Sequence, residues 1–112
     1  MQHNMKLNND PFNAIKLGNK TIEMRLYDEK RRKISVGDII EFENRETKDV
    51  ITAQVIALHI VNSFEDLYNM FDKTALGYQE YEIALYTDME QYYLKTDIEK
   101  YGVIGIEIQL LR

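Results

Sequence analysis

The stretch from Gly18 to Arg25, GNKTIEMR, brings an amine, a carboxylate and a guanidinium close together along the chain. Lys20, Glu23 and Arg25 could hold a phosphate or a base through charge-assisted hydrogen bonds. The same three side chains could instead form a surface ion-pair set, worth about 0–1 kcal/mol and without chemical use. Their spacing alone does not choose between the two interpretations.

Glu23 and Lys20 are the candidates for chemistry beyond binding. Glu23 could act as a general base if burial raised its pKa, but the neighbouring cations of Lys20 and Arg25 should push that pKa down. We therefore expect Glu23 to orient its neighbours or to accept hydrogen bonds. The catalytic residues, and whether any reaction is catalysed, are not decided by the residues alone.

A short strand should position these groups. Its apolar residues occur at every second position, as in a half-buried strand over 20–27: Ile22, Met24 and Leu26. Thr21, Glu23 and Arg25 share the opposite face, and Thr21 is therefore a further candidate ligand-binding residue. We predict that the apolar set is buried and that Glu23 and Arg25 line a concave surface.

Aromatic residues gather in the second half of the chain, where seven of the eight tyrosines fall between residues 68 and 101. Bases stack on such side chains, and Tyr92-Tyr93-Leu94-Lys95 alternates aromatics with a cation. Tyr92, Tyr93 and Lys95 are therefore candidate ligand-binding residues. The alternative is that these tyrosines form the half-buried rim of short helices, and a core role suits Tyr68 best.

The sequence gives little support for a metal or cofactor site. The sequence has no cysteine, so it offers neither a disulfide framework nor a Cys-ligated zinc site. His3 and His59 are far apart and lack ligand spacing, and His59, on a long apolar strand, is expected to be a satisfied core histidine. Neither a Ser-His-Asp or Cys-His arrangement nor a phosphate-binding glycine loop is present. We predict no metal and no cofactor.

Charge is unevenly distributed along the 112 residues. The net charge of −5 argues against a protein that coats nucleic acid through electrostatics alone. Residues 1–56 contain ten Lys or Arg and nine Asp or Glu, whereas residues 57–112 contain four and ten. An anion site should therefore lie in the first half, where the run 30–33 is either a solvated loop or part of that site. The acidic second half leaves open a protein-interaction module that meets a basic partner.

The chain is expected to form one domain over residues 1–112, because this length can bury one core but not two. Its start, MQHNMKLNND, has no apolar signal core, and no apolar run approaches the roughly 18 residues of a membrane span. We expect a soluble, cytoplasmic protein without membrane contact.

Turn and capping signals divide the chain into strands and helices. Asp10-Pro11 should open a helix that ends at Gly18. Strands are expected over 20–27, 39–44, 50–61 and from Val103 onward, and helices near 64–72, 78–86, 88–93 and 97–101. Three pairs have capping-box spacing: Ser63 with Asp66, Thr87 with Glu90, and Thr96 with Glu99.

The order of these elements predicts the fold class. The stretch 50–61 is apolar at both even and odd positions, so its strand should be covered on both faces or strongly bent. The last strand has to pair with one formed early in the chain. A small mixed sheet curled into a barrel, with short helices packed around it and over one opening, satisfies this order. The class is α+β.

The motif and its surroundings resemble the ASCH domain family, a branch of the PUA-like superfamily. The stretch 18–25 is similar to the family's G-x-K-x-x-E-x-R signature. Further similarity covers nearly the whole chain: Met5-Lys6-Leu7, Pro11-Phe12, residues 25–28, residues 33–38, residues 63–68 and residues 101–107.

The resemblance implies a small PUA-like β-barrel that binds RNA or a nucleotide-like ligand in a cleft between the barrel and flanking helices. Some relatives are ribonucleases, and one related bacterial enzyme removes the acetyl group from acetylated cytidine with a Lys and a Thr of this motif. The Lys matches Lys20, but the Thr position holds Glu23, and Thr21 shares the face of Glu23 instead. A hydrolase acting on RNA or a modified nucleoside is therefore the alternative to a binding domain.

Overall fold

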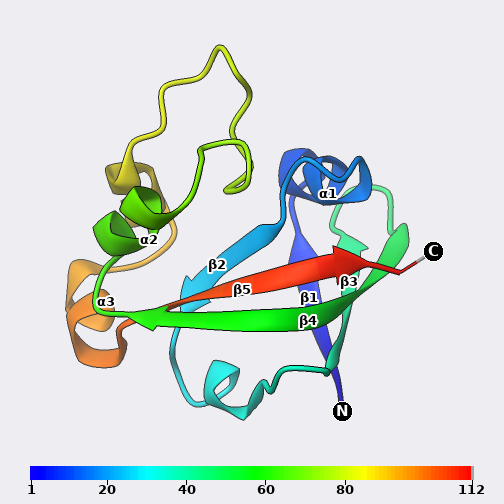
Figure 1. Ribbon diagram of the computed structural model, residues 1–112, viewed down its shortest axis with the longest axis horizontal. Helices are drawn as coiled ribbons and strands as arrows, with labels where there is room; N and C mark the ends of the chain where they lie inside the picture. The colour runs from blue at the N-terminus through cyan, green and yellow to red at the C-terminus, as the bar shows by residue number, and fades with distance from the viewer. Residues whose placement is uncertain (112) are drawn as a thin grey trace.

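The structure, a computed structural model, describes residues 1–111 and contains one five-stranded mixed sheet (Figure 1). Its strands are β1 (Gln2–Leu7), β2 (Ile22–Leu26), β3 (Ile39–Asn44), β4 (Val50–Val61) and β5 (Val103–Leu110). They lie in the order β1-β3-β4-β5-β2, with β1 and β3 parallel and every other pair antiparallel. The late strand β5 pairs with the early strand β2, as predicted.

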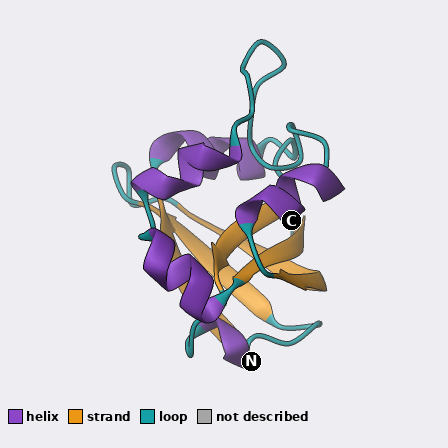
Figure 2. Ribbon diagram, turned by 90° about the vertical axis from the view of Figure 1, so that its left-hand side faces the viewer, coloured by secondary structure: helices purple, strands orange, loops and turns teal. Residues whose placement is uncertain are grey.

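Short helices surround the curled sheet, as Figure 2 shows. They are α1 (Asn9–Lys16), α2 (Phe64–Met70) and α3 (Lys95–Tyr101), with 3₁₀ turns η1 (Arg31–Lys33) and η2 (Tyr86–Gln91). The loop between α2 and η2 projects away from the sheet (Figures 1 and 2). The α+β class is confirmed, and the sheet forms a half-barrel whose two edges are β1 and β2.

Strand β4 bends, and this bend lets the sheet curl. Residues 50–54 pair with β3 and residues 53–61 with β5, and the register with β5 shifts between Val55 and Ala57. Such an irregularity increases local twist. Ile56 and Ile60 are exposed. Of the two alternatives predicted for this stretch, the bent strand is therefore correct and the strand covered on both faces is wrong.

Two apolar cores lie on the two faces of the sheet. One joins residues of β1 and β5, which are not neighbours in the sheet, so this core lies inside the curl. It includes Met5, Phe12, Phe42, Ile104 and Ile106. The other core packs β2 against α2 and includes Ile22, Met24, Leu26, Phe64 and Leu67. The predicted burial of the apolar set of β2 is thus confirmed.

The helix predictions were partly wrong. Residues 78–85 form a loop instead of the helix predicted over 78–86, and Tyr86 begins η2. Polar contacts made by Lys73 and Tyr78 hold the backbone of this loop in turns. The helix predicted over 88–93 is the 3₁₀ turn η2, and the one over 97–101 begins earlier, at Lys95.

Capping was predicted correctly at one helix. Ser63 Oγ accepts a hydrogen bond from the Asp66 backbone N–H at 3.2 Å, at the start of α2. Leu85 and Leu94 occupy the N-cap positions of η2 and α3, without a side-chain cap, so the other two boxes are wrong. The first helix begins at Asn9, ahead of the predicted Asp10. Pairs of residues with capping-box spacing also occur inside helices, so the spacing does not determine the residue at which a helix begins.

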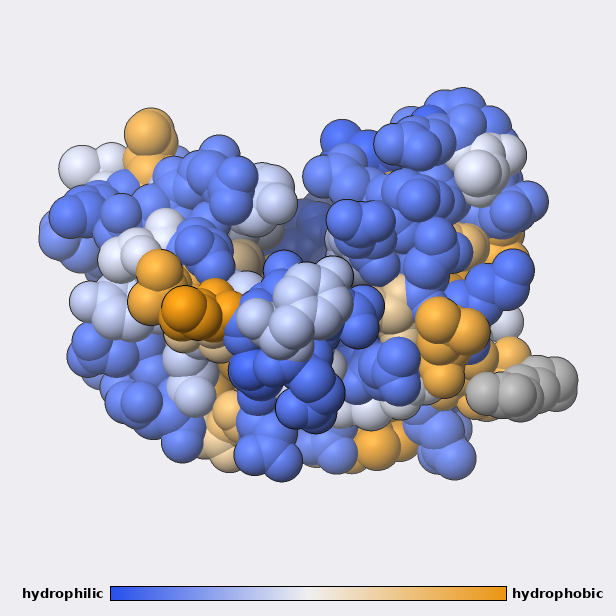
Figure 3. All heavy atoms as spheres, turned by 90° about the horizontal axis from the view of Figure 1, so that it is seen from above, coloured by the Kyte–Doolittle hydropathy of each residue, from blue (hydrophilic) through white to orange (hydrophobic). Residues whose placement is uncertain are grey.

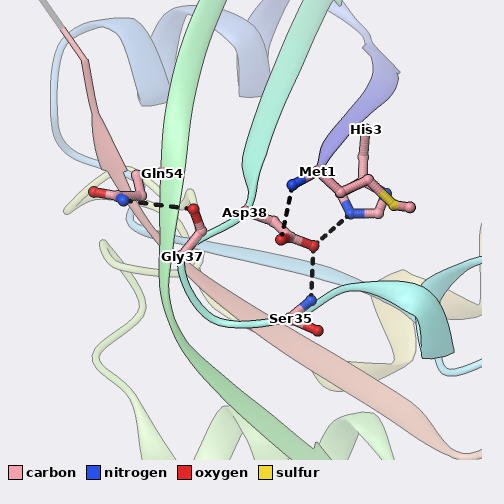
Figure 4. A network of polar contacts seen from close by, with 6 residues as sticks. All are labelled: Met1, His3, Ser35, Gly37, Asp38 and Gln54. Atoms are coloured by element: carbon pink, nitrogen blue, oxygen red, sulfur yellow. Dashed lines mark hydrogen bonds and ion pairs between the residues drawn. The ribbon is translucent and has the colours of Figure 1, made fainter.

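A polar cluster around Asp38 ties the start of β1 to the turn before β3 (Figure 4). Nε2 of His3 lies 2.8 Å from Asp38 Oδ2, which also accepts the Ser35 backbone N–H at 3.0 Å. The amino group of Met1 lies 3.3 Å from Oδ1. Contact with His3, followed by the Ser35 hydrogen bond, lowers the pKa of Asp38 from 3.8 to about 2.

We expect Asp38→Asn to destabilise the protein at neutral pH, and this loss to shrink in acid. Because folding lowers the pKa, the carboxylate stabilises the fold above about pH 4, and the contribution disappears as the pH falls through about 2. Urea denaturation of parent and variant across this range measures it. Asp49→Asn, in an exposed loop, is the control. A parent–variant difference that stays constant down to about pH 2 would contradict the assignment.

Candidate functional site

The centre of the site is a buried charge triad, defined as Lys20, Glu23 and Arg25. Glu23 Oε1 lies 2.8 Å from Lys20 Nζ, and Glu23 Oε2 lies 2.8 Å from Arg25 Nε. The three side chains are only 9%, 4% and 13% exposed. The triad is therefore an internal ion network and not the surface ion-pair set that spacing alone allowed.

Strand pairing places Glu23 and Arg25 on the concave face of the sheet. Glu23 pairs with Ile106, and Arg25 pairs with Ile104. Directly paired residues of neighbouring strands point to the same face, and both isoleucines belong to the core inside the curl. This agrees with the orientation predicted from the alternation of β2.

Arg25 also bridges the open side of the half-barrel. Its Nη2 donates to the backbone carbonyl of Lys6 at 3.3 Å. Lys6 lies on β1 and Arg25 on β2, the two edges of the sheet. The triad therefore lies at the seam where the two edges of the half-barrel face each other.

The electrostatics of the triad keep Glu23 ionised. Burial by itself raises the pKa of this carboxyl, but the charges and hydrogen bonds of Lys20 and Arg25 together bring it below its usual value. Two cations and one carboxylate leave the triad with one net positive charge. These contacts within the protein use one N–H of the three on Lys20 and two of the five on Arg25. The arrangement can bind an anion or an acceptor oxygen.

The turn that follows α2 positions Lys20, and the sequence analysis did not identify it. The Ala75 carbonyl accepts the backbone N–H groups of Thr21 and Ile22, both at 3.0 Å. A Cβ at Gly77 would lie 3.0 Å from Lys20 Cδ, so the Lys20 stem packs against this glycine. In the sequence, Gly77 itself could have indicated this turn. The glycine has a φ of +110° and lies in a segment that was expected to lead into a helix.

We expect Gly77→Ala to weaken ligand binding about tenfold by displacing the Lys20 stem, which corresponds to about 1.4 kcal/mol. Gly37→Ala is the matched control, because Gly37 has a similar φ of +96° but open space around it. Both variants should lose similar stability, about 1–3 kcal/mol, from strained backbone. Binding titrations measure the effect on ligand affinity, and urea denaturation measures the effect on stability. Equal ligand affinity of the two variants would argue against a positioning role for Gly77.

The aromatic candidates divide between the site and the surface. Tyr93 is close enough for its phenol to interact with the charges of Arg25 and Glu23, although burial is the main cause of its raised pKa. Its ring stacks on Phe64, with centroids 5.7 Å apart. Tyr92 is exposed, and Lys95 Nζ lies 3.7 Å from Glu90 Oε1, which does not belong to the triad. The structure brings Tyr93 to the triad but not Tyr92 or Lys95.

Thr21 and Lys20 line a cavity of about 300 Å³ between α1 and the end of β5. Its remaining lining residues are Ile15, Gly18, Ile108, Gln109 and Leu110. Seen from above, the molecule is also hollowed between two lobes, with hydrophilic atoms at the bottom (Figure 3). The Lys20 side chain thus belongs both to the buried triad and to a cavity wall.

The basic run 30–33 does not join the triad in a single site. Arg31–Lys33 form η1, in which Arg31 Nη1 donates to Asp28 Oδ2 at 2.9 Å. The Arg32 guanidinium lies 4.2 Å from the centre of the Tyr27 ring. Lys30, Arg32 and Lys33 are exposed, whereas the Arg31 side chain is only 17% exposed. Residues Arg31–Lys33 form a short 3₁₀ turn in place of the expected loop.

The two histidines have polar partners of their own. His59 Nε2 lies 2.9 Å from Glu107 Oε1, and its ring meets Phe71 edge to face. His59 is half-buried and satisfied, so its placement in the core was wrong. Across residues 1–111, no cluster of three or more potential metal ligands occurs. In the same part of the chain, no helix is long and apolar enough to cross a membrane.

Comparison with known proteins identifies the family. A family model described as the ASCH domain matches residues 5–112. The chain belongs to the ASCH domain family. Its α+β half-barrel is accordingly PUA-like, which confirms the expected family and fold. A comparison with curated proteins finds no match.

Solved structures resemble this ASCH domain over nearly its whole length. The hypothetical protein PH0355 shares 32% identity over 99% of this chain and 100% of its own, with a TM-score of 0.80. Protein PF0455 from Pyrococcus furiosus shares 34% identity over 100% and 99%, with a TM-score of 0.72. The ASCH structure from Zymomonas mobilis shares 19% identity over 95% of this chain and 65% of its own, with a TM-score of 0.65, and supports the fold alone.

Proposed function

We propose that this ASCH domain binds RNA or a nucleotide-like ligand at the Lys20–Glu23–Arg25 triad. The observation that carries the proposal is a buried ion network with one net positive charge beside a cavity of about 300 Å³. That volume lies at the lower end of the range of small-molecule sites. A cytoplasmic location would give the domain access to such ligands.

Energetics support a ligand-binding role over a structural one. Removing two cations and a carboxylate from water costs free energy that their mutual attraction often only just repays. Apolar side chains of similar volume would fill the inside of a half-barrel at least as well. Perturbed, buried charges are more common at functional sites than elsewhere. The triad is therefore better explained by what it binds than by what it stabilises.

Each group has a distinct role in this proposal. Lys20 and Arg25 donate to a phosphate or to an acceptor oxygen of a base, and Glu23 holds both cations in position. Thr21 contributes to the cavity wall, and Tyr93, whose phenol is influenced by the charge of Arg25, is the aromatic candidate. For Tyr92 and Lys95, a ligand contact is still a sequence-based prediction.

A hydrolytic function at the same site has less support. Both oxygens of Glu23 are engaged by cations, and its lowered pKa makes it a weak base. The position that would hold a threonine nucleophile in the related deacetylating enzyme holds this same Glu23. Binding without turnover is the function that the geometry favours.

Titration of the protein with nucleosides, nucleotides and a short single-stranded RNA at several salt concentrations tests the proposal. We expect RNA affinity to fall with salt at a log–log slope of roughly −0.7 for each phosphate contacted, over about two or three contacts. A slope near about −6 would indicate a broad electrostatic coat. That result, or no binding to any of these compounds, would exclude the proposed function.

A further inference from the structure

The 78–86 loop, defined as residues 78–86, presents apolar side chains to solvent. Tyr81 is 86% exposed, Ile83 is 79% exposed and Leu85 is 53% exposed. The loop stands out from the rest of the molecule in Figures 1 and 2. Large apolar side chains that gather on one exposed segment mark interaction surfaces more often than single exposed ones do.

This loop is held in shape by polar groups beneath it. Lys73 Nζ donates to the backbone carbonyls of Glu80 and Glu82, both at 2.7 Å. The Tyr78 hydroxyl donates to Asp88 Oδ2 at 2.7 Å and lies 2.6 Å from the Tyr68 hydroxyl. Polar side chains therefore anchor the loop from inside while apolar ones point outward. A surface that is already ordered loses less conformational entropy on binding a partner.

A notch of about 200 Å³ lies at the foot of the loop, against α2. Apolar and aromatic side chains form much of its lining, and a carboxylate and an amide add polar groups. The lining residues are Glu65, Tyr68, Asn69, Phe71, Lys73, Leu76, Ala84, Leu85 and Tyr86. The notch could receive one large side chain, with a charged group of the partner at Glu65.

The charge around this surface is negative. Residues 78–95 contain four carboxylates and one cation, Lys95, which lies 3.7 Å from one of them; the carboxylates are Glu80, Glu82, Asp88 and Glu90. Glu65 adds a fifth carboxylate from α2, and the Lys73 ammonium already donates to two backbone carbonyls. Such a surface repels phosphates and attracts cations.

We propose that the 78–86 loop and its notch form a docking surface for a basic segment of a partner protein. An apolar or aromatic side chain of that segment enters the notch, and flanking Lys or Arg side chains meet the carboxylates. Complementary charge favours this occupant over RNA, and the surface is separate from the triad. One domain would then bind an anionic ligand and a cationic protein segment at two different places.

Short fluorescent peptides that alternate Lys or Arg with Leu or Phe provide the probe, and fluorescence polarisation measures their binding. Peptides with Glu in place of the basic residues, or Ser in place of the apolar ones, are the peptide controls. The basic–apolar peptides should bind at least about tenfold more tightly than either control. Failure of these peptides to bind, or equal affinity for all peptides, would overturn the proposal.

The double variant Tyr81→Ser/Ile83→Ser should weaken peptide binding by about tenfold. Both side chains are exposed, so the fold should not change, and circular dichroism checks this. Leu17→Ser, at an exposed leucine beside α1, is the control and should bind peptide like the parent.

If the double variant instead lost RNA affinity, the loop would belong to the RNA site. Self-association that the double variant abolished would make a second copy the partner. Either result overturns the proposal.

Discussion

Glu23→Ala should lower the free energy of unfolding by about 3–5 kcal/mol, the expected cost of removing one partner from a buried ion network. The substitution leaves Lys20 and Arg25 buried and without the carboxylate that lies 2.8 Å from each. Small domains have total stabilities of about 5–15 kcal/mol. The variant should therefore be marginally folded, and urea denaturation followed by circular dichroism measures the loss.

Replacing all three members of the triad by methionine is the informative control. Lys20→Met/Glu23→Met/Arg25→Met removes the charges together, and such replacements of buried ion networks are often neutral or stabilising. We expect the triple variant to be at least about as stable as the parent. A triple variant as unstable as Glu23→Ala would mean that the triad is required for folding, and the energetic argument for a ligand would fail.

The orientation of the triad could be predicted from sequence, but its burial could not. The alternation of Ile22, Met24 and Leu26 is local, so the two faces of β2 follow from neighbouring residues. Burial of the triad depends on distant segments: the turn at Gly77, which packs against Lys20, and the edge strand that carries Lys6, whose carbonyl binds Arg25. The spacing of residues within the motif does not predict which distant segments will cover it.

The 78–86 loop is a second case in which local pattern was insufficient. A short helix was predicted there, but most of the stability of a helix comes from packing of an apolar face. Here Tyr81 and Ile83 point into solvent, and two backbone carbonyls bind Lys73 instead. The prediction failed because a lysine outside the segment determines the path of the backbone.

Lys20→Met should weaken the binding of RNA or nucleotide by about 1.5–3 kcal/mol, which is more than tenfold in Kd. The substitution removes the ammonium but keeps an unbranched stem against Gly77, so the packing of the turn is retained. Isothermal titration calorimetry at constant salt measures the loss. Urea denaturation of the same sample checks that the variant is folded.

Glu23→Gln distinguishes binding from catalysis at the same site. If the site only binds, the parent has no turnover to lose, and Glu23→Gln changes affinity alone, because the amide NH2 must face one of the two cations. If Glu23 transfers a proton, affinity should be nearly unchanged while turnover falls by about 10²–10⁴. Because Lys20 and Arg25 disfavour its neutral form, we expect the first result. Cleavage or deacylation by the parent that Glu23→Gln abolishes would show the second.

The ratio of RNA affinities between Lys20→Met and Lys33→Met tests the central claim most directly. Each substitution removes one positive charge, but Lys33 lies in the exposed basic run and Lys20 in the buried triad. Both variants are titrated with the same single-stranded RNA at the same salt concentration. We predict that RNA affinity falls more than about tenfold for Lys20→Met and less than about twofold for Lys33→Met. Equal losses in the two variants would mean that RNA responds to overall charge, and the triad would not be its binding site.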